Sequence, residues 1–134
     1  MATFNKFNSF VEALSEKVHN LGSDTLTVAL TNTLPVNTNT VLANITQISY
    51  TNLSTRVLAG VTSAQTSGTY KLDANDLVLT ASGTVAQFRY VVLYNDTAAS
   101  DELIGWYDYG AAVDLLNGET FTITWDVAGI LSLA

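Results

Sequence analysis

Residues 85–109, VAQFRYVVLYNDTAASDELIGWYDY, decide the fold, because no other stretch of similar length holds so many large apolar side chains. Side chains alternate between the two faces of a strand, and the first part of this stretch is apolar on both faces. Such a strand is typical of the middle of a packed sheet. A polar loop over 95–101 and a second apolar segment complete a predicted central hairpin. Its expected core residues are Phe88, Tyr90, Val92, Ile104 and Trp106.

Strict alternation also assigns side chains of this hairpin to faces. Two pairs are expected to share a face: Phe88 with Tyr90, and Ile104 with Trp106. Tyr107 and Tyr109 are then the aromatic residues most open to a partner. Together with the loop 95–101, they are where the hairpin is expected to meet another molecule.

The rest of the chain shows the same period of two after residue 23, which is typical of strands. Further strands are expected at 25–31, 55–65, 69–72, 77–82, 119–126 and 130–133. Residues 41–49 instead fit one or two helical turns. The predicted fold is therefore mainly β: an antiparallel, jelly-roll-like β-sandwich of about eight strands.

The N-terminal segment has a helical period. Apolar residues recur at spacings of three and four over 4–21, and Gly22 follows where a helix-ending glycine belongs. We predict a single domain over 1–134, with an α-helix in residues 1–22 and the sandwich in 23–134. The helix is interpreted as a lid over the sandwich or as a docking element. The residues that would bind a partner are Phe4, Phe7, Val11, Leu14 and Val18.

Composition and charge disfavour several classes of function. The net charge is −7 and the five basic residues are scattered, so no cationic track for nucleic acid or for an anionic membrane surface is expected. Cysteine is absent, which excludes disulfides and thiolate chemistry. No apolar run approaches the ~20 residues of a membrane span, and no secretory signal core follows Lys6.

Few residues are placed for catalysis. The single histidine, His19, has no neighbour at metal-ligand spacing, and a position near the end of the helix explains it. Asp108 with Asp114 is an example of a carboxylate pair for glycoside hydrolysis, an interpretation that nothing else supports. We therefore predict a protein that is not an enzyme, without a catalytic site or a cofactor.

Two loops concentrate acidic residues. Calcium binds oxygen ligands from such loops, but no EF-hand spacing is present, and solvated turn residues are the favoured interpretation. No metal site is predicted. The acids are Asp96, Asp101 and Glu102 in one loop, and Asp73 and Asp76 in the other.

Four stretches resemble a family of small proteins from tailed bacteriophages. They are FNKFNSFVE from Phe4, LGSDTLTVALTNTLP from Leu21, FRYVVLYNDTA from Phe88 and LIGWYDYG from Leu103. The resemblance covers most of the chain. It implies a virion structural component, with head decoration, or cement, as the expected role.

This resemblance implies adhesion rather than chemistry. A cement protein binds the major capsid protein on the capsid exterior and stabilises the head by bridging capsomers, through many modest contacts that act together. Such subunits are commonly homotrimers. The alternative is a tail, baseplate or head-fibre component that adheres to a partner or a host glycan, with Tyr107 or Tyr109 as a stacking surface.

Overall fold

A computed structural model of the chain describes residues 2–134. In this part of the chain it has the short helices α1 (Ser9–Ser15) and η1 (Leu42–Asn44). The strands are β1 (Asn5–Lys6), β2 (Leu26–Thr31), β3 (Thr62–Thr66), β4 (Thr69–Asp73), β5 (Leu77–Thr80), β6 (Val85–Asn95), β7 (Leu103–Leu115), β8 (Thr120–Ile123) and β9 (Leu131–Leu133). All the strand pairs are antiparallel, which confirms the prediction of a mainly β, antiparallel fold with one α-helix.

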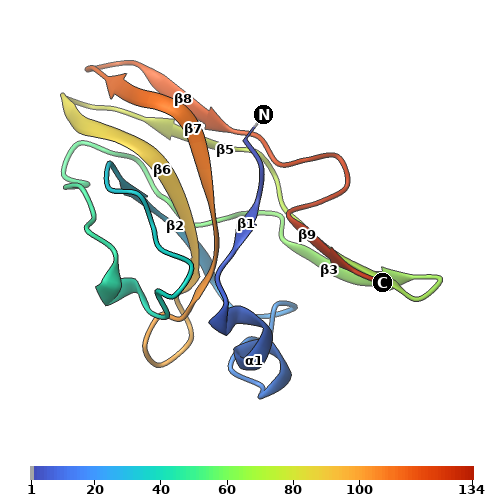
Figure 1. Ribbon diagram of the computed structural model, residues 1–134. Helices are drawn as coiled ribbons and strands as arrows, with labels where there is room; N and C mark the ends of the chain where they lie inside the picture. The colour runs from blue at the N-terminus through green and yellow to red at the C-terminus, as the bar shows by residue number, and fades with distance from the viewer. Residues whose placement is uncertain (1) are drawn as a thin grey trace.

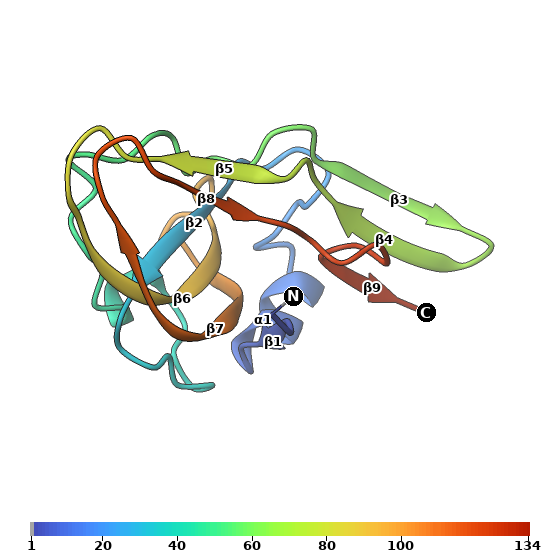
Figure 2. The same cartoon turned by 90° about the horizontal axis from the view of Figure 1, so that it is seen from above.

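The strands form three sheets, with the orders β1-β7-β6-β2, β5-β8 and β3-β4-β9. The four-stranded sheet and the β5-β8 pair lie in two layers, and the third sheet extends to one side of both (Figures 1 and 2). The larger core cluster includes Leu30, Leu79, Phe88 and Ile123, which come from both layers. The architecture is therefore a sandwich that does not close.

The outward face of the four-stranded sheet has a buried cluster of its own. All six residues of β2 are buried, and Ala29 belongs to this second cluster together with Val92. Ile45 and the half-buried Leu42, from the loop after β2, pack against it. A loop rather than a third layer of strands therefore covers this face.

Register shifts in β6 and β7 move side chains off the predicted faces. The pairing shifts between Phe88 and Tyr90. Phe88 packs in the larger cluster, whereas the Tyr90 ring lies 6.2 Å from the ring of Trp106, which packs against the second cluster. Ile104 has no partner between the pairs Leu93–Gly105 and Tyr94–Leu103, and it packs in the larger cluster, opposite to Trp106. Because an extra residue in a strand reverses the alternation, the two predicted face pairs are wrong. Four of the five predicted core residues are buried, and Trp106 is half-buried.

The loop after β2 also closes the outer edge of that strand. Val28 N donates to Arg56 O at 3.0 Å, and Leu58 N donates to Leu26 O at 2.9 Å. The prediction of a strand over 55–65 is wrong for its first half, because this segment runs irregularly along β2. Only its end is a strand, β3.

The predicted helix over 4–21 is wrong at its beginning. Asn5 and Lys6 form β1 and pair with Trp106 and Gly105 of β7. The two backbones approach closely because residue 105 is glycine. A Cβ there would lie 2.9 Å from the backbone oxygen of Asn5 and would clash with the Phe4 ring.

The helix also ends earlier than predicted. α1 stops at Ser15, and Lys17 adopts a φ of 69°, the left-handed conformation that ends many helices. Val18 N donates back to Ala13 O at 2.9 Å, which closes the last turn. The chain then turns back toward β2, so that Leu21 packs in the core.

The sheet β3-β4-β9 forms a projection that we call the arm (residues 62–73 and 131–133). Its β3–β4 hairpin extends away from the other sheets (Figure 2). The turn residues Ser67 and Gly68 have φ values of 52° and 84°, as in the type I′ turns that two-residue hairpins favour. In β3 and β4 only Leu72 is buried, so the arm has little core of its own.

Candidate binding groove

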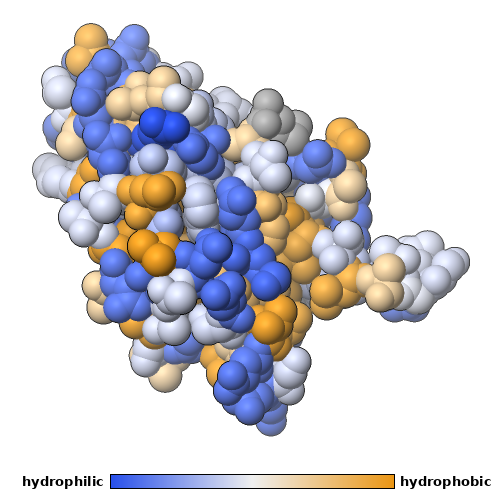
Figure 3. All heavy atoms as spheres, viewed as in Figure 1, coloured by the Kyte–Doolittle hydropathy of each residue, from blue (hydrophilic) through white to orange (hydrophobic). Residues whose placement is uncertain are grey.

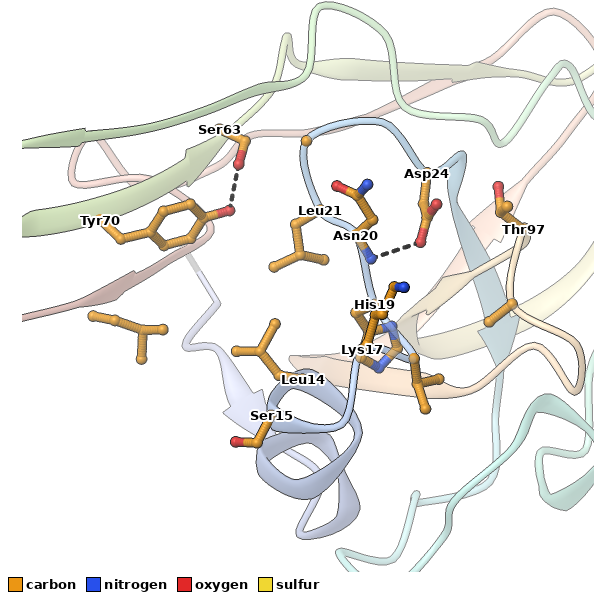
Figure 4. A pocket seen from close by; sticks show the side chains of 14 residues that line it. Leu14, Ser15, Lys17, His19, Asn20, Leu21, Asp24, Ser63, Tyr70 and Thr97 are labelled. Atoms are coloured by element: carbon orange, nitrogen blue, oxygen red, sulfur yellow. Dashed lines mark hydrogen bonds between the residues drawn. The ribbon is translucent and has the colours of Figure 1, made fainter.

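A groove of about 690 Å³ lies between the arm and the chain segment that ends α1 and follows it. In Figure 4, Leu14 and Leu21 lie on the side of this segment, and Tyr70 lies across from them on the arm. Leu133 of β9 adds to the arm's wall. The polar side chains of the groove are Ser15, Lys17, His19, Asn20, Asp24, Ser63 and Thr97.

The arm has one apolar face, and this face borders the groove. Cross-strand partners share a face, and the pairing gives the rows Gln65–Tyr70–Leu133 and Ser63–Leu72–Leu131. Leu133 is 49% exposed and Tyr70 is half-buried. Apolar residues gather where the arm meets the rest of the molecule (Figure 3). The apolar face of the arm is therefore only partly covered in a single copy of the chain.

A buried polar junction holds the segment 19–24 beside the groove. Asn95, at the end of β6, is fully buried. Its Nδ2 donates to His19 Nδ1 at 3.0 Å and to Asp24 Oδ2 at 2.7 Å. Its Oδ1 accepts from two backbone N–H groups of the next loop. One side chain thus ties the N-terminal segment to the loop after β6.

The prediction that His19 lies in the last turn of a long helix is wrong, because α1 ends at Ser15. The side chain of His19 is instead buried, with 5% of its surface exposed. Because its Nδ1 accepts a hydrogen bond, the hydrogen-bond network assigns the proton to Nε2. Nε2 is buried and has no hydrogen-bond partner within residues 2–134. Burial lowers the pKa of His19, and the nearby carboxylates of Glu102 and Asp24 raise it by less. The folded protein therefore favours the neutral imidazole.

The structure separates the five residues predicted to bind a partner. Phe7 is fully buried in the second core cluster, and Phe4 is half-buried against the larger one. The docking prediction is therefore wrong for Phe7. Leu14 and Val18 line the groove, and Val11 is 51% exposed on α1. These last three are open to a partner.

The carboxylates of Asp108 and Asp114 each have a hydrogen-bond partner on β6. β7 bulges between them: Asp108 pairs with Tyr90 and Val113 pairs with Phe88, a separation of five residues on β7 against two on β6. Hydrogen bonds of 2.8 and 3.1 Å join Arg89 to Asp108 and lower the pKa of that carboxyl. Asp114 accepts from Gln87 at 2.7 Å.

Two acids of these loops have close polar partners. Glu102 accepts from the backbone of Ser100 at 2.8 Å, and Asp73 pairs with Lys71 at 3.4 Å. Across residues 2–134, no three His, Asp or Glu side chains are grouped for a metal ion.

The two tyrosines predicted to be open are not. Tyr107 is buried between Phe4 and Trp125, whose rings lie 5.7 Å from it. Tyr109 is half-buried with its edge against Phe121. Burial raises the pKa of both phenols, to about 12 for Tyr109. Tyr107 offers no open ring face for sugar stacking, and Tyr109 is only partly exposed.

The arm's side of the groove is absent from the sequence-based prediction. The segments TYKLD and LSL alternate apolar and polar residues, a signal that indicates one apolar face. No local pattern shows that this face stays partly uncovered. Asn95 gives still less signal, because an Asn before Asp96 is typical of an ordinary turn.

Comparisons with protein-family models, with curated proteins and with solved structures found no match to this chain. Neither helix in residues 2–134 is long and apolar enough to cross a membrane.

Proposed function

We propose that this protein acts by binding other proteins and is not an enzyme. The observation that carries the proposal is the arm, whose apolar face is half-covered and borders a groove. Full burial of a leucine side chain is worth about 1.5–3 kcal/mol, so covering Leu131 and Leu133 would stabilise a complex.

Within that class, we propose a phage head decoration protein. The four stretches that resemble small virion proteins support this assignment. The net charge of −7 also supports it, because a net negative charge helps particles stay dispersed. The partner would be the major capsid protein, and the location would be the capsid exterior. Copies bound at neighbouring capsomers would bridge them and oppose the pressure of packaged DNA.

In this proposal the groove is the surface that contacts the capsid. Leu14 and Val18 lie on its N-terminal side, and Tyr70 and Leu133 lie on the arm. A protruding apolar segment of the capsid protein would fill the groove and cover both walls at once.

Purified virions of the phage that encodes this chain provide the test. Cryo-electron microscopy and quantitative mass spectrometry are expected to find the protein on the head, in numbers comparable to the major capsid protein. A few copies at the tail would instead support a tail or baseplate component.

A matched pair of variants tests the groove itself. Leu14→Asp with Val18→Asp places charge in the groove and is expected to abolish binding to heads that lack the protein. Leu116→Asp, at a residue 54% exposed in the β7–β8 turn, is expected to bind like the wild type. Unchanged binding by the groove variant would contradict this role.

A further inference from the structure

We propose that two copies of this chain join edge to edge through β3, so that the arms form one continuous antiparallel sheet. The contact is two-fold: the same five-residue strand of each copy faces the other. Since it names a second partner for the arm, the inference rests on the proposed function. Its test in solution does not depend on any virion.

The outer edge of β3 is open. Loop residues cover other edges, with backbone hydrogen bonds of 3.0 Å from Val28 of β2 to Arg56 and from Ser54 to Thr80 of β5. Within residues 2–134, β3 makes no backbone hydrogen bond beyond its ladder with β4. β3 also lacks the charge, proline or bulge that commonly protects an edge strand from pairing.

The free backbone groups of β3 point outward at two residues. Ile130 N donates to Leu72 O at 2.7 Å, so the carbonyl of Leu72 points toward β9 and away from β3. These directions alternate along an antiparallel ladder. Ser63, opposite Leu72, and Gln65, opposite Tyr70, therefore turn their N–H and C=O groups out of the sheet.

The sequence of β3, TSAQT, fits a copy of itself that runs in the opposite direction. With Ala64 facing Ala64 of the second copy, Ser63 faces Gln65, and Thr62 faces Thr66. Ser63 and Gln65 are the residues whose backbone groups are free, so each copy's Ser63 can exchange hydrogen bonds with the other's Gln65. Cross-strand threonine pairs are favourable, and no like charges are opposed.

Charge also favours the arm as the place where two acidic copies meet. Of the five basic and 12 acidic residues, only Lys71 and Asp73 lie in the arm, and they pair with each other at 3.4 Å. The arm is therefore neutral, and the net charge of −7 belongs to the rest of the chain. Joining at β3 keeps the two acidic parts on opposite sides of a neutral sheet.

The two-fold contact differs from the homotrimer that the family resemblance implies. A two-fold contact closes on itself, whereas a ring of three needs two different surfaces on each copy. Pairing at β3 also aligns the apolar faces of both arms along one side of the joined sheet.

Cysteine cross-linking tests the register. The chain has no cysteine, so a single one reports only its own neighbours. Residues opposed in a non-hydrogen-bonded antiparallel pair have Cα atoms about 4.5 Å apart, within disulfide range. Ala64→Cys is expected to form a disulfide-linked dimer on mild oxidation, seen by intact mass. Thr69→Cys, also exposed but one strand further in, is the control and is expected to stay unlinked.

Charge substitutions at the same residue provide a second test. Ala64→Lys and Ala64→Glu each place two like charges at the two-fold axis, so each variant alone is expected to be monomeric by analytical ultracentrifugation. An equimolar mixture of the two is expected to recover the dimer, because Lys then faces Glu. A variant that fails to fold could not recover the dimer in the mixture. Circular dichroism of each variant therefore checks that it is folded.

Three results would overturn the inference: a monomeric wild type at high protein concentration, a trimer, or equal cross-linking of Thr69→Cys and Ala64→Cys. A dimer that is missing from virions would leave the inference standing and contradict the decoration function. A monomer found on virion heads would contradict the inference and leave the decoration function standing.

Discussion

The buried imidazole of His19 links folding to pH. Its pKa is lowered in the folded chain, whereas in the unfolded chain histidine takes up a proton near pH 6.5. Between the two pKa values the unfolded state binds more protons than the folded state. Stability therefore rises with pH through this window and is complete above about pH 6.5.

We expect urea-unfolding experiments to show a loss of stability as the pH falls from about 7.5 to about 5.5. His19→Gln keeps a side chain that can accept from Asn95 but does not titrate, so its stability is expected to change less over the same range. Asp24 and Glu102 are common to both proteins, and the difference in slope isolates the imidazole. Equal slopes would contradict the role given to His19.

Gly105 lies where the backbones of β1 and β7 approach closely. Gly105→Ala is expected to lower the free energy of unfolding by about 1–3 kcal/mol, because its Cβ would press on Phe4 and on the backbone of β1. Gly22→Ala is the control: its Cβ would find its nearest heavy atom at 3.5 Å, an ordinary contact. Urea unfolding of both variants measures the contrast, and equal losses would contradict the packing argument.

At the scale of elements, the central hairpin was predictable and its details were not. The density of large apolar residues over 85–109 is enough to indicate β6 and β7, both of which are present. The faces of Phe88 and Ile104 depend on bulges, which arise from how the two strands pair rather than from composition. Alternation therefore predicts burial here better than it predicts orientation.

In the N-terminal segment, by contrast, the type of element itself was predicted wrongly at its beginning. Residues 4–21 have a helical period, yet the first turn is replaced by a strand because β7 offers an edge beside Gly105. The paired residues lie 101 positions apart for Asn5 and Trp106 and 99 for Lys6 and Gly105, so no local pattern can reveal the pairing. Tertiary pairing overrides helix propensity in such cases, since propensity is only a weak preference.

The burial of Phe7 in the N-terminal segment predicts a large effect on stability. Phe7→Ala is expected to lower the free energy of unfolding by about 3–5 kcal/mol, because the side chain is fully buried. Val11→Ala, on the exposed side of α1, is expected to change it by no more than about 0.5 kcal/mol. Chemical denaturation measures both, and similar values would mean that the N-terminal segment is not part of the core.

At the scale of the whole molecule, the groove could not be predicted, because it depends on which faces remain uncovered. Leu14 and Val18 are predicted to bind a partner, but Tyr70, from the middle of the chain, and Leu133, from its C-terminal strand, complete the site. The distribution of charge is likewise visible only in three dimensions. The sequence shows a net charge of −7, and the fold shows that the arm is neutral.

This distribution predicts how self-association depends on salt. The acidic parts of two copies repel each other, and salt screens that repulsion over about 10 Å at 0.1 M. The dimer is therefore expected to tighten when sodium chloride is raised from about 20 mM to about 300 mM. Sedimentation equilibrium measures the dissociation constant at each concentration. Weakening with salt would indicate a contact between opposite charges instead.

The exposed tip of the β3–β4 hairpin is a place where the chain can accept inserted sequence. A Cβ on Gly68 would meet no heavy atom within 4 Å, and both turn residues are exposed. Exposed loop tips tolerate added sequence better than paired strands do. New segments are therefore best accommodated between Ser67 and Gly68, where a displayed peptide would extend outward from the arm. The five residues before that turn have no such freedom, because each is held in register by β4.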